Sequence, residues 1–182
     1  MEKNQKESLR MELVKVGEVR SELTTPNFYG CDSETDSEER IRKLRESHEK
    51  IKNLISEIII YPEWEELLQG IEAFSHILVL FWPHLLDQER RKVRKVHPMG
   101  RKELPEQGIF ATCSPARPNP VLITAVQLLE LNGNKLKVKG FEALDGTPVI
   151  DIKPYSKHYH KVDNPVVPDW MLRIHQDLGI DI

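Results

Sequence analysis

The sequence predicts a mainly β fold, a small antiparallel β-barrel with attached helices (α+β). Short apolar segments recur along the chain, and turn residues rather than regular crossover helices separate them, which favours antiparallel strands. Residues 121–139 contain the clearest hairpin, because two runs with alternating apolar side chains flank Asn132-Gly133-Asn134. The chain has 182 residues, of which 39% are hydrophobic, and this is enough for one domain with its own core.

The chain begins with a polar stretch that precedes the first strand. Residues 1–10 are mostly polar or charged, so we expect them to be flexible and the single domain to span 11–182. Leu13–Arg20 is predicted to be the first strand. A loop is predicted over 24–35, because this segment contains both proline and glycine.

An inserted amphipathic helix is predicted near 36–57. Asp36 or Ser37 can cap its N-terminus. The apolar stripe follows alternating spacings of three and four and consists of Ile41, Leu44, Ile51, Ile55 and Ile58, with His48 beside it. The sequence leaves two partners open for this stripe, the rest of its own domain or a second copy of the helix.

The remaining elements are short. A helical turn is predicted from Pro62 to Leu68, since proline suits the first helical position. A closing helix is predicted over Pro168–Leu178. The further predicted strands are Ile58–Ile60, Phe74–Trp82, Ile109–Thr112, Val121–Leu131, Lys135–Lys139 and Thr147–Ile152.

The composition is typical of a cytoplasmic protein that does not enter a membrane. The longest apolar run, Ile77–Trp82, is too short to cross a bilayer and suits a buried strand. The charged N-terminus does not resemble a secretory signal. Cys31 and Cys113 lie far apart, so neither a disulfide framework nor a paired metal knuckle is predicted.

The charge of the chain points to nucleic acid only locally. The net charge of -3 gives no general attraction to phosphates. Seven of the thirteen residues in Arg90–Lys102 are Lys or Arg, and this stretch could neutralise several phosphates of an RNA. The same stretch could equally be a solvated surface without a partner.

Two proline-containing segments are the strongest candidates for a working site. Ser114–Pro120 contains three prolines, which fix the backbone and display Arg117 and Asn119 with little freedom. A fixed guanidinium suits a carboxylate or phosphate, and a fixed amide suits a base edge. A stiff connector with an exposed arginine is the simpler interpretation.

The second segment is Asp145–Tyr155. It opens with an Asp-Gly turn, continues as a strand that carries Asp151 and Lys153, and ends on Tyr155 after a proline. A carboxylate, an ammonium group and a phenol at the end of a strand suit a small-ligand site. An edge strand with a salt bridge is the alternative.

Other motifs are weak or absent. His76 and His84 bracket the most apolar strand and can be structural or functional. His158-x-His160 with Asp163 lacks further ligands, so no metal site is predicted. The sequence contains no Gly-x-Gly dinucleotide fingerprint and no P-loop, which argues against a Rossmann crevice.

Four blocks in order resemble a known family, the S-adenosylmethionine-dependent tRNA (adenine-N6)-methyltransferases, which use a small β-barrel instead of a Rossmann fold. The resemblance extends from about Val14 to Tyr155, apart from the inserted helix. The blocks are Gly70–His76, Gly108–Thr112, Arg117–Pro120 and Asp145–Tyr155.

The resemblance implies a homodimer that binds S-adenosylmethionine near the subunit interface and methylates N6 of threonylcarbamoyl-adenosine beside the tRNA anticodon. The implied cofactor contacts are His84, Cys113, Ile123, Glu142, Ala143, Leu144 and Asp145. Arg117, Asn119, Lys153 and Tyr155 would bind the substrate nucleotide. Asp145 would accept the N6 proton, with Asn119 and Tyr155 holding the base.

The chain departs from the family pattern at several positions. The family commonly has Arg at the position of Cys113 and Gly at the position of Leu122, and its Pro-Arg-Gly segment reads Pro98-Met99-Gly100 here. Longer family members also carry a C-terminal extension. Two alternatives therefore stay open: a non-catalytic module that binds S-adenosylmethionine or a nucleotide, and a dimeric RNA-binding protein that retains only the scaffold.

Overall fold

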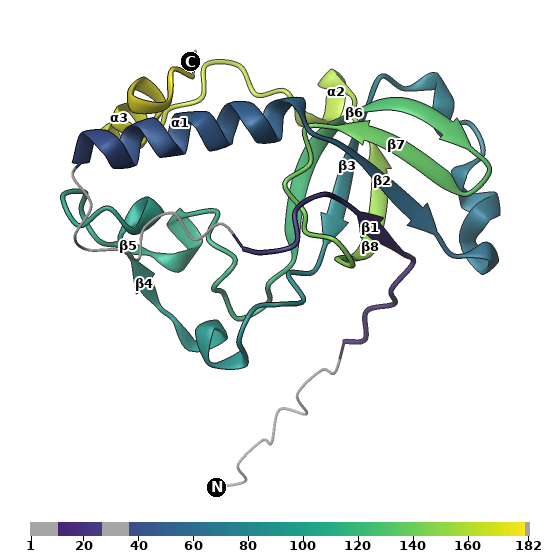
Figure 1. Cartoon of the computed structure of the whole chain (residues 1–182), viewed down its shortest axis with the longest axis horizontal. Coiled ribbons are helices and arrows are strands. Elements are labelled where there is room, and N and C mark those ends of the chain that lie inside the picture. The colour runs from purple at the N-terminus through teal and green to yellow at the C-terminus, as the bar shows by residue number, and fades with distance from the viewer. Residues whose placement is uncertain (1–10, 27–36, 181–182) are drawn as a thin grey trace, which may run out of the picture.

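The barrel is formed by strands from both halves of the chain. The computed structural model describes residues 11–26 and 37–180; Cys31 and the 1–10 segment lie outside them. Among the described residues, six antiparallel strands close into a barrel in the order β1-β2-β7-β6-β3-β8 (Figure 1). The strands are β1 Gly17–Arg20, β2 Ile55–Ile60, β3 His76–Phe81, β6 Leu122–Asn132, β7 Lys135–Lys139 and β8 Pro148–Pro154. The predicted fold class is confirmed.

Alternating side chains fill the interior of the barrel. In β7, Leu136 and Val138 are fully buried, while Lys135 and Lys137 between and beside them are exposed. Phe141 is fully buried and meets Phe81 edge to face, with 5.1 Å between the ring centroids. The other fully buried core side chains are Val19, Ile58, Ile77, Val79, Val126 and Val149.

Helix α1, Ser37–Asn53, ends earlier than predicted. Residues 55–57 belong to β2, because Ser56 and Ile58 alternate inward with a period of two. Ile55 is therefore exposed and Ile58 lies in the barrel core, so neither extends the helical stripe. Leu44 of the stripe is buried within the single copy, and α1 packs against α3, Asp169–Leu178, of the same chain.

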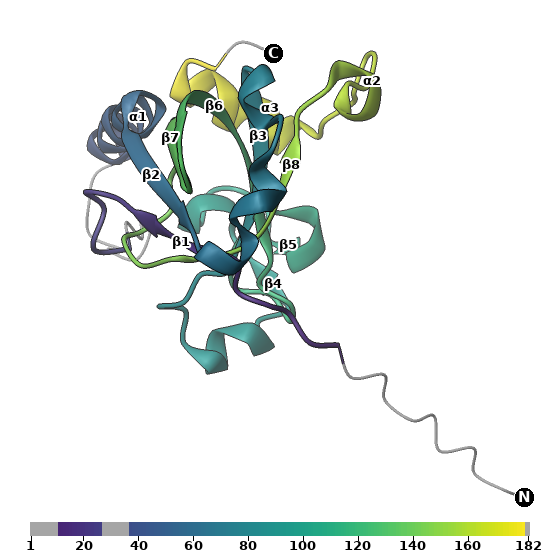
Figure 2. The ribbon, with the colours of Figure 1, turned by 90° about the vertical axis from the view of Figure 1, so that its right-hand side faces the viewer.

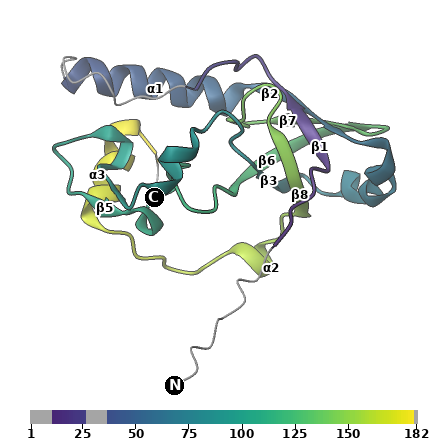
Figure 3. The same cartoon turned by 90° about the horizontal axis from the view of Figure 1, so that it is seen from below.

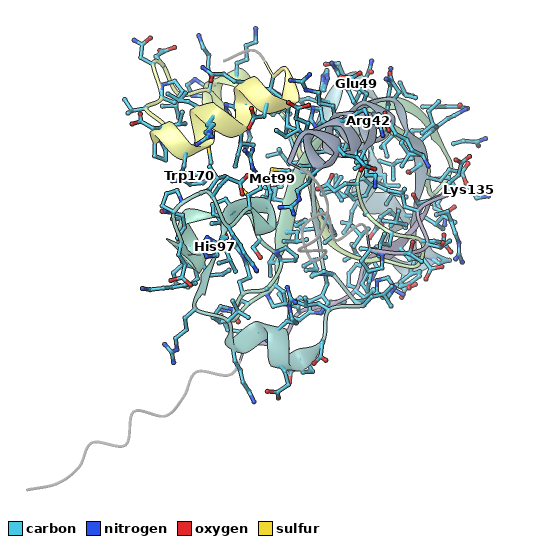
Figure 4. The ribbon with its side chains drawn as sticks, turned by 60° about the vertical axis from the view of Figure 1, so that its left-hand side comes forward. Arg42, Glu49, His97, Met99, Lys135 and Trp170 are labelled. Carbon is cyan, nitrogen blue, oxygen red and sulfur yellow. The ribbon has the colours of Figure 1, made fainter. Side chains whose placement is uncertain are left out.

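A second lobe lies beside the barrel and contains α1, α3 and the short strands β4 Lys95–Val96 and β5 Gln107–Gly108 (Figures 1 and 3). Arg101, only 3% exposed, donates to Glu103 at 2.7 Å and to Asp177 of α3 at 2.6 Å. Burial alone would lower the pKa of Arg101, but the two carboxylates outweigh it and raise the pKa. Met99 lies on the side of this lobe that faces α1 and α3 (Figure 4), with a positive φ of 53°.

Two predicted strands differ in the structure, and one short helix was missed. The first strand starts at Gly17 rather than Leu13, whose side chain is 58% exposed. The strand predicted at Ile109–Thr112 is a 3₁₀ turn over Ile109–Ala111, closed by Thr112, whose backbone and hydroxyl both donate to the Ile109 carbonyl. The short helix α2, Lys157–His160, was not predicted. The hairpin of β6 and β7 is confirmed.

The start of β1 needs a residue without a side chain. A Cβ on Gly17 would collide with the backbone oxygen of Ile59 and lie 3.0 Å from Ile60 Cα. We expect Gly17→Ala to lower the free energy of unfolding by about 1–3 kcal/mol, the usual cost of overpacking. Gly108, whose added Cβ would meet nothing within 4 Å, is the matched control. Urea unfolding of both variants checks this, and equal effects would contradict it.

Candidate functional site

The ends of three strands meet at one end of the barrel. Phe81, the last residue of β3, pairs with Leu122 at the start of β6 and with Val149 near the start of β8. This register brings together His84 after β3, the loop before β6 and the turn before β8. They lie at the lower end of the barrel in Figure 1. Five candidate cofactor residues, His84 and 142–145, therefore share one region with Ile123.

The turn before β8 is fastened to the segment that follows β1. The backbone N–H groups of Asp145 and Gly146 donate to the carbonyls of Leu23 and Val19 at 2.7 and 2.8 Å. Asp145 Oδ1 accepts a hydrogen bond from the Ser21 backbone N–H at 3.1 Å. Its carboxylate is therefore held by the backbone. It also lines a shallow hollow of about 360 Å³ with Arg20, Ser21, Glu22, Ile55, Ser56, Glu57 and Lys137.

His84 lies against this turn. Its Nδ1 is 3.3 Å from the hydroxyl of Thr147, and its Nε2 would be 3.9 Å from a Cβ placed on Gly146. Gly146 has a φ of 72°, which glycine adopts without strain. Because Thr147 is buried and His84 is exposed, the imidazole is anchored on one side and open to solvent on the other.

Glu142 is the acidic group with the most altered environment at this end. Its Oε1 accepts a hydrogen bond from the Thr124 hydroxyl. Neighbouring protein atoms exclude water from the carboxyl group, and this desolvation raises the pKa of Glu142 above its ordinary value. The hydrogen bond from Thr124 lowers the pKa, but by less. The residue still has an exposed surface. A ligand can therefore reach a carboxyl group that protonates more readily than an ordinary glutamate.

The side chains flanking Glu142 differ in exposure. Ala143 is buried and Leu144 is half-buried, so they support the turn rather than offer polar groups. Ile123 is 59% exposed on the outer face of β6, next to Thr124 in sequence. The candidate cofactor residues thus comprise an apolar support and a few polar groups, as in many small-molecule sites.

Two arginines fasten the loop Ser114–Pro120. Arg117 Nε donates to the Ser114 carbonyl at 2.8 Å, and a second guanidinium nitrogen donates to the Thr112 carbonyl. Arg91 donates to the Pro118 carbonyl from two nitrogens, at 2.8 and 3.1 Å. The prolines remove backbone donors, so arginine side chains bind carbonyls of this segment instead.

The loop displays Asn119, as the sequence suggested, but Arg117 is turned to its own loop. Much of the Arg117 hydrogen-bonding capacity is used within its own loop, which leaves less for a ligand. Asn119 and Cys113 are exposed. The excess of carbonyls over donors in a triple-proline segment was the signal that could have predicted the internal role of Arg117.

Lys153 and Tyr155 lie at the opposite end of the barrel. Pro154 pairs with Ile77 at the start of β3, and the Tyr155 N–H donates to the His76 carbonyl at 3.1 Å. At about 3.3 Å per residue, β8 places roughly 20 Å between this end and Asp145. Within one copy, the structure does not bring Tyr155 together with Asp145 and Asn119. Lys153 pairs with Asp151 at 2.7 Å.

The basic stretch Arg90–Lys102 is largely engaged within the molecule. Arg101 is buried against α3, and Arg91 holds the proline loop while lying 5.4 Å from the Trp82 ring centroid. Two of its lysines form ion pairs, Lys92 with Glu89 and Lys95 with Glu106. Its charge is therefore partly compensated by neighbouring groups.

The described residues contain neither a metal-binding cluster nor a membrane-spanning helix. In 11–26 and 37–180, no group of three or more His, Cys, Asp or Glu side chains is arranged to hold a metal ion. No helix in the same part of the chain has both the length and the apolar character needed to cross a membrane.

Comparison with known proteins places these features in a family. Residues 43–161 match the model of the tRNA-methyltransferase O N-terminal domain. A protein of Methanothermobacter thermautotrophicus described as a probable S-adenosyl-L-methionine-binding protein is 50% identical over 109 residues, 60% of this chain and 73% of that protein. The mouse tRNA (adenine(37)-N6)-methyltransferase is 36% identical over 118 residues, 65% of this chain and 25% of the mouse protein.

Solved structures agree with the barrel. A TrmO crystal structure superposes with a TM-score of 0.64 at 23% identity, covering 87% of this chain and 64% of that chain. TrmO from Pseudomonas aeruginosa gives 0.62 at 22% identity, covering 87% and 62%. The chain thus spans less than two thirds of these solved proteins, and the likeness concerns the fold. Because the matched model covers more than half of the chain, the chain belongs to the tRNA-methyltransferase O N-terminal domain family.

Proposed function

We propose that this protein is an S-adenosylmethionine-dependent tRNA methyltransferase of the cytoplasm, acting on N6 of threonylcarbamoyl-adenosine beside the anticodon. The observation that carries the proposal is the convergence of His84, Glu142 and Asp145 at one barrel end within the family-matched region. The names of the archaeal and mouse relatives support the cofactor and the reaction class.

The groups at this barrel end suit the cofactor. S-Adenosylmethionine carries a sulfonium cation, an ammonium group and ribose hydroxyls, and when bound it supplies an activated methyl group. Glu142 and Asp145 offer carboxylates to those groups, and His84 offers an imidazole open to solvent. Ile123, Ala143, Leu144 and the segment at Cys113 complete the proposed wall.

The proposed chemistry depends on holding the acceptor nitrogen and removing its proton. Asp145 accepts the proton that N6 loses on methylation, since its carboxylate is held by the Ser21 N–H. Asn119, exposed on a rigid loop, binds the base edge, and Arg117 keeps that loop in shape. Lys153 and Tyr155 contact the RNA at the other barrel end of the same copy.

A non-catalytic S-adenosylmethionine-binding module is the second candidate. It is favoured by Cys113, which is exposed where the family commonly has Arg, so that a fixed cation is missing from the proposed wall. Cofactor binding without methyl transfer to any tRNA would favour it over the enzyme.

Methyl transfer from labelled S-adenosylmethionine to tRNA carrying threonylcarbamoyl-adenosine is the direct test. We expect Asp145→Asn to lower kcat by roughly 10²- to 10⁴-fold, the usual contribution of a general base. Asp169→Asn, an exposed carboxylate on α3, should leave kcat unchanged. Wild-type protein that is folded yet neither binds the cofactor nor transfers label would refute the proposal.

The raised pKa of Glu142 predicts the pH dependence of cofactor binding. The ionised carboxylate attracts the cofactor's positive charges and the protonated form does not, so affinity should fall as the pH drops through a pKa above 4.5. Glu142→Gln should bind more weakly at neutral pH and lose this dependence. Calorimetric titrations from pH 4 to 8 measure it, with Glu63→Gln as the exposed control. An unchanged pH profile in Glu142→Gln would contradict the assignment.

We also propose that two copies associate at the barrel end that carries the site. Large apolar side chains are exposed there: Ile123 at 59% and Leu85 at 52%. Phe110, just before the loop Ser114–Pro120, is 82% exposed. Phe110→Ser should shift the protein towards the monomer in light scattering after gel filtration. Val166, which lies between α2 and α3 and is 97% exposed, is the control, and Val166→Ser should not change the oligomeric state. A monomeric wild-type protein at micromolar concentration would contradict this.

A further inference from the structure

The short segment after β8 concentrates rings that the proposed chemistry does not use. Tyr155 stacks on His160, with 5.3 Å between centroids and 20° between planes. His158 and Tyr159 meet edge to face at 5.0 Å, and Tyr159 approaches His160 at 6.3 Å. Three of these residues belong to α2, which projects from the barrel beyond the end of β8 (Figure 2).

Tyr159 is the exposed tyrosine of this group, whereas Tyr155 is half-buried. Its side chain is 80% exposed, although α2 is ordered by Ser156, whose hydroxyl accepts the His158 N–H at 3.3 Å. The Tyr155–His160 stack holds the base of the segment against β8, where Tyr155 also lies 6.4 Å from the His76 ring. A short, anchored segment thus presents an exposed aromatic ring, which can stack on a flat ligand with little loss of side-chain freedom.

The charge around the ring is positive. Lys153, Lys157 and Lys161 occur every fourth residue, and no acidic residue lies between 152 and 162. The outer two pair with flanking aspartates, Lys153 with Asp151 at 2.7 Å and Lys161 with Asp163 at 3.0 Å. Among the described residues, Lys157 has no such partner. It belongs to the same four-residue helix as Tyr159, so this short segment carries both an exposed ring and a lysine without an acidic partner.

Exposed rings interleaved with lysines are the chemistry that binds single-stranded nucleic acid. Each base offers a face for stacking on an aromatic ring, and lysines contact the neighbouring phosphates. A duplex offers only its phosphates to such a surface, because its bases are already stacked. The surface therefore fits unpaired nucleotides better than a helix.

We propose that residues 155–161 form a docking surface for unpaired nucleotides of the RNA substrate, with one base stacked on Tyr159 and its phosphates near Lys157 and Lys161. This inference rests on the proposed function, since it assumes an RNA substrate. The surface lies at the opposite barrel end from Asp145, so it contributes RNA affinity and leaves cofactor affinity unchanged.

The test compares the binding of two RNA probes to the full chain by fluorescence anisotropy. One probe is a tRNA anticodon stem-loop and the other is a blunt duplex of the same length without unpaired bases. Tyr159→Ala should weaken stem-loop binding roughly 5- to 100-fold, whereas Tyr159→Phe should stay near wild type. Duplex binding should not change. Val166→Ala, an exposed residue of the same C-terminal segment, is the matched control.

Salt dependence separates the lysines from the ring. Replacing Lys157 and Lys161 together by Gln should reduce the slope of log K against log salt by about 1.4 for a single strand. Tyr159→Ala should leave that slope unchanged. Lys43→Gln on α1 is the control for a general loss of charge, because Lys43 is exposed and lies on the other lobe.

Two outcomes would overturn the inference: stem-loop affinity unchanged in folded Tyr159→Ala, or equal loss with both probes. A surface used for a protein partner would give the first. The proposed function can fail separately. RNA binding that depends on Tyr159 without any methyl transfer would refute the enzyme and support the docking surface. Methyl transfer with the same KM for RNA in wild type and Tyr159→Ala would support the enzyme and refute the docking surface.

Discussion

Strand β3 pairs with β6 on one side and β8 on the other, and this double register determines where every candidate group lies. Residues distant in sequence become neighbours because the end of β3 faces the start of both partner strands. Slipping either register by one residue would turn buried side chains such as Val79 and Val126 outward. The packed interior therefore defines the geometry of the surface turns, and Ala143 of the turn before β8 is itself part of that interior.

Under the proposed function, the barrel separates chemistry from recognition within one copy of the chain. The end with Asp145 and Glu142 has carboxylates that accept hydrogen bonds from Ser21 and Thr124, and it suits a small cationic ligand. The end with Tyr155 and Tyr159 has rings and lysines and suits a polymer. An RNA long enough to reach both ends, or a second copy that contributes one of them, would connect the two functions.

Much of the fold could be predicted from local pattern, and the errors have physical causes. The hairpin of β6 and β7 was readable because alternation and turn residues agree. The end of α1 could not be read from the sequence, because Ile55 and Ile58 fit a helical stripe as well as a strand. Their pairing with β1 and β7 is what makes this segment a strand. The separation of Tyr155 from Asp145 could have been predicted, because an extended strand between them places them at opposite ends of the barrel. The internal use of Arg117 and Arg91 required knowing which carbonyls lacked donors.

The hydrogen bond from Arg45 to the Asp177 backbone carbonyl joins residues 132 positions apart in the chain. Arg101, which lies between them in sequence, donates to the carboxylate of the same aspartate. Closing a loop of this length costs chain entropy, as does the pairing of Gly17 with Val149 that closes the barrel. Helix α3 packs on α1 much less extensively than the barrel strands pack on one another, so we expect α3 to open more often than those strands. Since α1 leads directly into β2, each such opening would loosen one flank of the barrel while its central strand β3 stays paired.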